Sequence, residues 1–433
     1  MGLFLGKSGV AYQMMRFFKW DSIPSILFPD FSHKNCQIVD IMNKKMFSTI
    51  ILTLLGVICS AQKISSKSQV ILENQKNDDI PQINQLWNKY LLSSPDSLYN
   101  NPYWNNKEKE KYKSYDLLRS EGYLGLYNMA KYSDMKNLVL SITPIKNNLY
   151  DIHSMYFWEG EEYPYVICTT HVLSYKDEEG KFVLSNWLNY YSRNWRTYTK
   201  GEITYHYQSC KKNREKINKS LAFLSFIEKE YDVRIEHMDV FISSGWRESQ
   251  RLKGFGYDIG ETAKSDMTDL GGTTDIENCI IYSNSEKGEY YQHEMMRLVR
   301  SRYINANSLL TDGLSEYYSD DCVMRGISFK KHFQSLNDFL EEHLDINLGK
   351  FEFIDSGNLT ESNYLIGMIL VKMIDERCGH NKLIEALETV HTNNELINFI
   401  NNELYICPEE INTALRKKIA YYSKNNFLPK KWQ

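Results

Sequence analysis

Proline is scarce in this chain, with 9 residues in 433, and several patterns that would assign a function are missing. Basic residues are scattered, and no long run of one charge sign marks a tail that would bind nucleic acid. The glycines between residues 254 and 272 follow no strand–glycine–helix order, so they form no nucleotide-binding fingerprint. The chain has no internal repeat, and its net charge of −4 favours no nucleic-acid partner.

No pair of cysteines has the close spacing of a zinc ribbon. Six cysteines follow residue 61, namely Cys168, Cys210, Cys279, Cys322, Cys378 and Cys407. An oxidising compartment permits disulfides among them in several pairings, and buried free thiols are an equal alternative.

One apolar stretch has the length of a targeting signal. Met42-Asn-Lys-Lys supplies positive charge, residues 46–58 form an apolar run of 13, and small residues lead to Ala61. This order predicts a secretory signal peptide over 42–61, because the run is too short to span a bilayer. We interpret residues 1–41 as an upstream extension from a start codon assigned too early. We expect the mature chain to be secreted, periplasmic or in the cell envelope, without a membrane span.

After a polar linker at 62–80, the residue pattern predicts an α+β unit over 81–200. Apolar residues at helical spacing begin near Pro81, and residues 107–134 also favour helix. Alternating β-branched and aromatic residues then predict four strands, at 137–143, 150–158, 164–174 and 181–188.

A second unit is predicted over 201–433, with a small sheet followed by helices. Strands are expected at 203–207, 238–243 and 278–282, with a helix over 211–230. The chain after Tyr282 favours helix to its end, and the segment 361–378 is apolar almost all round, as a buried helix is.

The most informative motif is His293-Glu294-Met-Met-Arg297, followed by Asp312-Gly-Leu-Ser-Glu316. Residues four apart on a helix lie about 6 Å apart along its axis, so two histidines at that spacing can hold one zinc ion. Arg297 stands where the second histidine would be. A guanidinium has no lone pair to donate and stays charged, so it repels a metal ion.

This order of elements resembles the gluzincin branch of zinc peptidases. In that family the metal-binding helix reads His-Glu-x-x-His, and a later helix supplies a Glu within a pattern such as Leu-x-Glu-Gly-Leu-Ala-Glu-Tyr. The strand NCIIYS and Tyr290-Tyr291-Gln292 match the family's edge strand and helix entry, and residues 363–367 resemble a buried helix behind the site. The resemblance covers about residues 201–400.

The resemblance implies a zincin-like domain that binds Zn²⁺ and a peptide or protein. His293 and Asp312 would be metal ligands, Glu316 a substitute ligand, and Glu294 the general base. The chain departs from the family at Arg297, which replaces histidine, and at Asp312, which replaces glutamate.

Structural interpretations stand beside these roles. Glu294 could pair with Arg297 on the helix surface, and Asp312 could cap a helix N-terminus. A linked hypothesis pairs Arg297 with Asp312 in the vacated metal space. Tyr290, Tyr291 and Tyr364 are either core residues or hydroxyls near the cleft, one of which could stabilise an oxyanion.

Three functions follow from the sequence. The first is an exported gluzincin-fold protein that has lost zinc and proteolysis and binds a peptide or protein in its cleft. The second is an active, atypical zinc peptidase that uses His293, Asp312 and Glu316. The third is an envelope or extracellular interaction protein that binds through residues 81–200.

Overall fold

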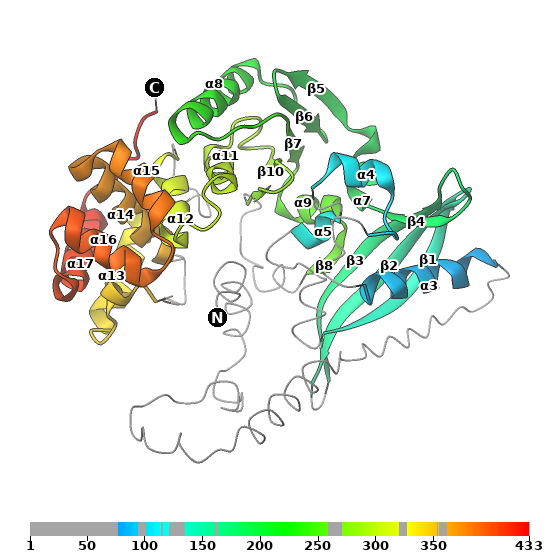
Figure 1. The fold of residues 1–433 in the computed structure, drawn as a ribbon, viewed down its shortest axis with the longest axis horizontal. Coiled ribbons are helices and arrows are strands. Elements are labelled where there is room, and N and C mark those ends of the chain that lie inside the picture. The colour runs from blue at the N-terminus through cyan, green and yellow to red at the C-terminus, as the bar shows by residue number, and fades with distance from the viewer. Residues whose placement is uncertain are drawn as a thin grey trace, which may run out of the picture.

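The computed structural model describes residues 77–93, 101–113, 116–120, 135–160, 163–258, 271–319, 327–352, 354 and 362–432. They form two five-stranded sheets and a helical C-terminal region (Figure 1). The predicted α+β class is confirmed at that level. The predicted signal peptide, the upstream extension and most of the predicted linker lie outside the described residues. Within the described ranges, no helix is both long and apolar enough to cross a membrane.

The first sheet is an antiparallel meander in the order β1-β2-β3-β4. Its strands are β1 (Lys136–Lys146), β2 (Leu149–Glu159), β3 (Pro164–Lys176) and β4 (Phe182–Ser185). All four predicted strands are found. The last ends early, because the short helix α7 (Trp187–Tyr191) and the 3-10 turn η4 (Ser192–Asn194) follow it. Asn148 has a left-handed backbone (φ 58°) in the turn between β1 and β2, a conformation that asparagine tolerates well.

Helix α3 (Asp79–Leu91) packs on one face of this sheet (Figure 1). Ile80, Ile83 and Trp87 recur at helical spacing and are buried against the strands. The Trp87 indole N–H also donates to Asn137 at 3.0 Å, so the ring is both buried and satisfied. Helices α4 (Asn106–Lys111) and α5 (Leu117–Ser120) follow, and the rest of the helix predicted to residue 134 lies outside the described residues.

The second sheet is mixed, in the order β5-β6-β7-β10-β9. Its strands are β5 (Arg196–Lys200), β6 (Ile203–Tyr207), β7 (Met238–Ser243), β9 (Thr273–Asp275) and β10 (Ile280–Asn284). β6, β7 and β10 run parallel, and β5 and β9 are antiparallel edge strands. Parallel neighbours need a crossover, which α8 (Arg214–Tyr231) provides between β6 and β7. The Asn213 side chain caps α8 by accepting hydrogen bonds from the N–H groups of Glu215 and Lys216.

Several short elements differ from the sequence prediction. β5 lies in the second sheet, although the predicted boundary at residue 200 placed its residues in the first unit. The glycine-containing connection contains α9 (Trp246–Lys253) and β8 (Phe255–Asp258), and β8 returns to pair with β3. The segment NCIIYS supplies the interior strand β10, and the edge beside it is β9. Strands of three to five residues give too little periodicity to place them in a sheet.

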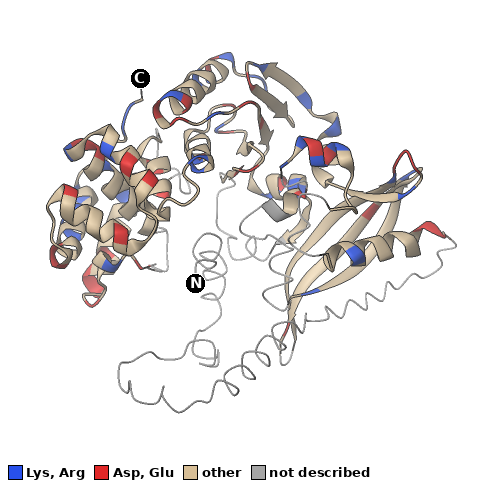
Figure 2. Cartoon of the chain, in the orientation of Figure 1, with Lys and Arg blue, Asp and Glu red and all other residues tan. Residues whose placement is uncertain are grey.

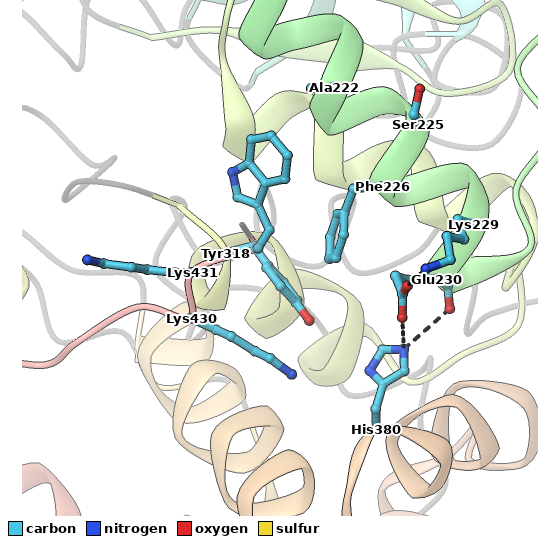
Figure 3. A pocket seen from close by; sticks show the side chains of 10 residues that line it. Ala222, Ser225, Phe226, Lys229, Glu230, Tyr318, His380, Lys430 and Lys431 are labelled. Carbon is cyan, nitrogen blue, oxygen red and sulfur yellow. Dashed lines mark hydrogen bonds and ion pairs between the residues drawn. The ribbon is translucent and has the colours of Figure 1, made fainter.

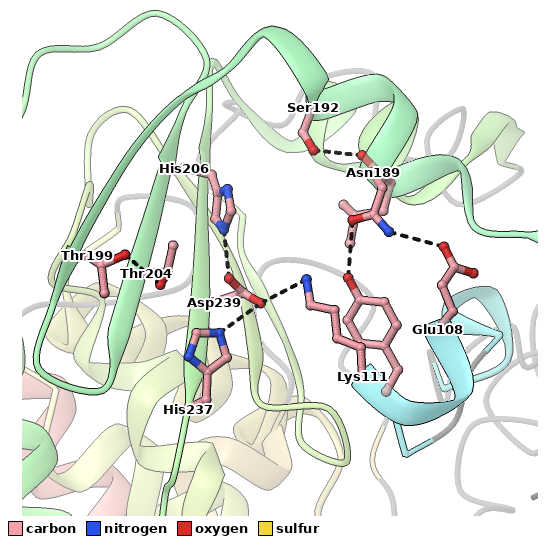
Figure 4. Close-up of polar contacts among 11 residues, drawn as sticks. Glu108, Lys111, Asn189, Ser192, Thr199, Thr204, His206, His237 and Asp239 are labelled. Carbon is pink, nitrogen blue, oxygen red and sulfur yellow. Dashed lines mark hydrogen bonds and ion pairs between the residues drawn. The ribbon is translucent and has the colours of Figure 1, made fainter. Parts of the chain in front are cut away.

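A buried carboxylate joins the two units (Figure 4). Asp239 on β7 accepts a hydrogen bond from His206 on β6 at 2.7 Å, and its other oxygen lies 3.3 Å from His237 and 3.7 Å from Lys111 of α4. Burial would raise the pKa of Asp239, but the His206 hydrogen bond and the nearby positive charges hold it below its ordinary value. This cluster fastens α4 to the second sheet.

The described residues beyond β10 form mainly helices. Its elements are α11 (Gln292–Met296), η5 (Arg297–Ser301), α12 (Ser308–Tyr317), α13 (Phe329–Glu342), η6 (Leu348–Lys350), α14 (Ser362–Cys378), α15 (His380–Thr389), α16 (Asn393–Leu404) and α17 (Pro408–Lys424). As predicted, α14 is buried over most of its length. Acidic and basic residues are interspersed over the helices around it (Figure 2). The cysteines in the described ranges are free thiols, and Cys322 lies outside those ranges.

Two glycines set the contact between α12 and α14. A Cβ on Gly313 would overlap the Gly367 carbonyl, and a Cβ on Gly367 would overlap the Leu309 carbonyl and lie 3.0 Å from the Gly313 Cα. The two backbones therefore touch, which no larger residue allows. α12 carries Glu316, so this contact also fixes the position of that carboxylate.

We expect Gly313→Ala to lower the free energy of unfolding by about 1–3 kcal/mol, because the added methyl group forces the two helices apart. Gly379→Ala is the matched control. Gly379 has open space around its Cα and a backbone (φ 87°, ψ 167°) that L side chains rarely adopt, so its variant meets conformational strain but no overlap. Urea unfolding followed by circular dichroism measures both. An unchanged or increased free energy of unfolding for Gly313→Ala would contradict the close contact.

Candidate functional site

The structure brings three of the predicted site residues together. His293 and Glu294 lie on α11, and Glu316 lies on α12. The His293 Nδ1 is 3.3 Å from a Glu316 carboxylate oxygen, and its Nε2 is 3.9 Å from Glu294. The three side chains are only 6%, 3% and 2% exposed, so their charges interact with little screening by water.

Arg297 sits at the end of α11, where the helix changes to the 3-10 segment η5. Its backbone N–H still donates to the His293 carbonyl, which keeps the two residues one helical turn apart. The guanidinium lies 3.9 Å from the Glu294 carboxylate. The four-residue spacing of the motif is thus preserved, with a cation in the second position.

Asp312 does not join the cluster. Its carboxylate lies 3.6 Å from the guanidinium of Arg300, one turn farther along η5. The hypothesis that Arg297 pairs with Asp312 is therefore wrong. The N-cap interpretation is also wrong, since α12 begins after Asn307, whose side chain accepts from the Leu309 N–H, and Asp312 lies mid-helix.

Glu316 lies beside His293, where the sequence analysis predicted the carboxylate of Asp312. Residues four apart share a helix face but lie one turn apart, so only one of them can face His293. The donor set His293, Asp312 and Glu316 is not assembled. Within the described residues, no three His, Cys, Asp or Glu side chains are grouped so that they could hold a metal ion.

Thr274 is a site residue that sequence reasoning missed. It lies on the edge strand β9, and its hydroxyl is 2.7 Å from both the backbone carbonyl and a carboxylate oxygen of Glu294. A single hydroxyl hydrogen donates to one of these acceptors at a time. This contact fastens the edge strand to α11 and holds the Glu294 side chain. β9 has only three residues, so the sequence carried no strand signal there.

The cluster contains charged groups of both signs. Burial opposes protonation of His293, but the negative charges of Glu316 and Glu294 raise its pKa above the ordinary value. With His293 protonated, two cations, His293 and Arg297, face two carboxylates, Glu294 and Glu316. Neither Glu316 oxygen accepts a hydrogen bond from a described residue, so its charge depends on His293 for compensation.

Two of the three predicted tyrosines lie beside the cluster. The Tyr364 ring centre is 6.0 Å from that of His293. Tyr291 is buried next to α11, and burial together with the charges of Glu294 and Glu316 raises its pKa, so its phenol stays neutral. Tyr290 points elsewhere, because its hydroxyl accepts a hydrogen bond from the Trp432 indole at 2.9 Å.

No protein-family model matches this chain, and no curated protein is significantly similar to it.

We expect the His293–Glu316 pair to stabilise the fold most at low pH. A raised folded-state pKa means that the contribution is complete below the unfolded pKa of histidine and is lost as pH rises through the folded pKa. The excess stability of the wild type over His293→Gln, measured by urea unfolding, should be larger at about pH 6 than at about pH 9.

His343→Gln is the control. His343 is exposed at the end of α13, so this variant loses an imidazole outside the cluster. A difference between the wild type and His293→Gln that is constant with pH, or that grows as pH rises, would rule out the ion pair.

Proposed function

We propose that this chain is a zincin-like protein that has lost its metal and its peptidase chemistry and now binds an extended peptide segment. The succession of a small sheet, a His-Glu helix, a second helix with a facing carboxylate and a buried helix behind it supports the gluzincin resemblance. The resemblance implies Zn²⁺, so the donors present decide whether the ion can be held.

The observation that carries the proposal is the guanidinium of Arg297, 3.9 Å from Glu294 and one turn from His293. Catalytic zinc is held by three protein ligands, and here His293 and Glu316 supply two. The third position holds a permanent cation without a lone pair. Because Arg297 already lies beside Glu294, a divalent ion would add positive charge next to an existing cation.

The predicted general base is also engaged. A catalytic Glu294 would have to take a proton from an activated water. Its carboxylate instead accepts from Thr274 at 2.7 Å or lies against Arg297. The side chain that would activate water is used here to hold the edge strand.

The same edge strand provides a place for a partner. Among the described strands, β9 pairs with β10 alone, so it ends the sheet. A sheet edge offers backbone N–H and C=O groups to an extended chain, and β9 lies directly beside the cluster through Thr274. We propose that a peptide or protein segment docks along β9, outside the cytoplasm, as the signal sequence at 42–61 implies.

Arg297→His tests the loss of metal. The new imidazole completes a donor set with His293 and Glu316, so the variant should retain about one zinc per molecule after dialysis, and the wild type far less. Atomic emission measures the zinc. Arg300→His is the matched control, because Arg300 lies three residues on and faces Asp312; this variant should gain none.

Adding Glu316→Gln to Arg297→His should remove the gained zinc, whereas adding Asp312→Asn should leave it. A wild-type protein that holds zinc as tightly as Arg297→His would contradict the loss of metal. A gain that depends on Asp312 instead of Glu316 would contradict the site geometry.

Peptide binding without cleavage tests the rest of the proposal. Fluorescein-labelled, reduced and carboxymethylated casein should bind saturably in fluorescence anisotropy, because it presents extended chain to the β9 edge. Mass spectrometry after prolonged incubation should find the casein intact. Cleavage that a chelator abolishes would identify an active zinc peptidase, and no saturable binding would argue against docking at the β9 edge.

A further inference from the structure

A cavity lies away from the His293 cluster, between α8 and the C-terminal tail. Its volume is about 510 Å³, within the range of small-molecule sites. Two hydrogen bonds hold the tail in place. The Lys430 backbone N–H donates to the Tyr317 carbonyl, and the Trp432 indole N–H donates to the Tyr290 hydroxyl.

Aromatic rings form one wall of this cavity (Figure 3). The Phe226 ring centre lies 5.3 Å from that of Tyr318 and 5.9 Å from that of Trp432. The rings come from α8, from the end of α12 and from the tail, so the cavity exists only while the tail is docked. Such a wall favours a planar apolar group, which gains both burial and ring contacts.

Basic groups dominate the polar part of the lining. Lys229, Lys430, Lys431 and His380 line it together with Glu230, whose carboxylate lies 3.2 Å from Lys229 and 3.8 Å from His380. Lys430 is oriented by Asp375, behind the cavity, at 2.7 and 3.0 Å. The interaction with Asp375 also raises the pKa of His380. Lys431 is exposed, and no ion pair is formed by it within the described part of the chain. The cavity therefore has positive charge that its own carboxylates do not match.

We propose that this cavity binds a small organic anion with a planar apolar group, such as an aryl phosphate or an aryl carboxylate. The ring lies against Phe226 and Trp432, which pack beside the buried Tyr318, and the anionic group faces the lysines. An anion is attracted by the unmatched positive charge of Lys431, whereas a cation of the same shape would be repelled by it.

The ligand would contact the elements that carry the first site. Tyr318 follows Glu316 on the same helical segment, and its carbonyl accepts a hydrogen bond from the Gln292 side chain at 3.0 Å. Gln292 immediately precedes His293. The inference goes beyond peptide docking at β9 and does not depend on it.

Calorimetric titration of the mature chain with phenyl phosphate tests the proposal. We expect one saturable site, with phenyl phosphate binding at least about tenfold tighter than inorganic phosphate or benzyl alcohol, since each of these lacks one half of the recognised chemistry. Equal affinity for the three probes, or no saturable binding of phenyl phosphate, would overturn it.

Charge-reversal variants locate the site. Lys229→Glu and Lys431→Glu should each weaken phenyl phosphate binding by about fivefold or more, because each places a negative charge at the cavity rim. Lys107→Glu is the matched control, since Lys107 is 86% exposed on α4 and does not line the cavity. Weakening by Lys107→Glu equal to that by the two cavity variants would also overturn the proposal.

Discussion

His293 and Glu316 face each other at 3.3 Å where almost no water reaches either side chain. A buried ionised carboxylate without a cation is costly, so an ionised Glu316 is stabilised by a metal ion or by a protonated His293 beside it. Arg297 affects which of these two partners is stable. It places a permanent positive charge next to Glu294, and its guanidinium has no lone pair to donate to a metal ion. The ion pair and the guanidinium are therefore linked parts of one electrostatic arrangement.

The surrounding fold holds this arrangement from three sides. The glycine contact between α12 and α14 sets the position of Glu316, and the Thr274 hydroxyl ties the edge strand to Glu294. The continuing backbone hydrogen bond from Arg297 to the His293 carbonyl preserves the motif's spacing up to the change into η5. These contacts hold the positions of Glu294 and Glu316 from outside the cluster.

The sequence predicted the long elements well and the site only in part. α8, α14 and the strands β6 and β7 have strong periodicity, and they are found close to where the residue pattern placed them. β9 was missed because three residues carry no period, and Thr274 was missed with it. The choice between Asp312 and Glu316 could not be made from spacing, because both lie on one face of α12. Which turn of α12 faces His293 depends on how closely α12 approaches α14. That approach depends on the contact between Gly313 and Gly367, which lie 54 residues apart in the sequence.

The protonation state of His293 tests the central claim most directly. Nitrogen NMR of the protein with ¹⁵N-labelled histidine rings, assigned with His293→Gln, reports whether each ring nitrogen carries a proton. The account predicts that at about pH 6 both nitrogens of His293 are protonated, and that excess Zn²⁺ leaves their shifts unchanged. A neutral ring at that pH, or a nitrogen that takes the shift of a metal-bound imidazole when zinc is added, would contradict it.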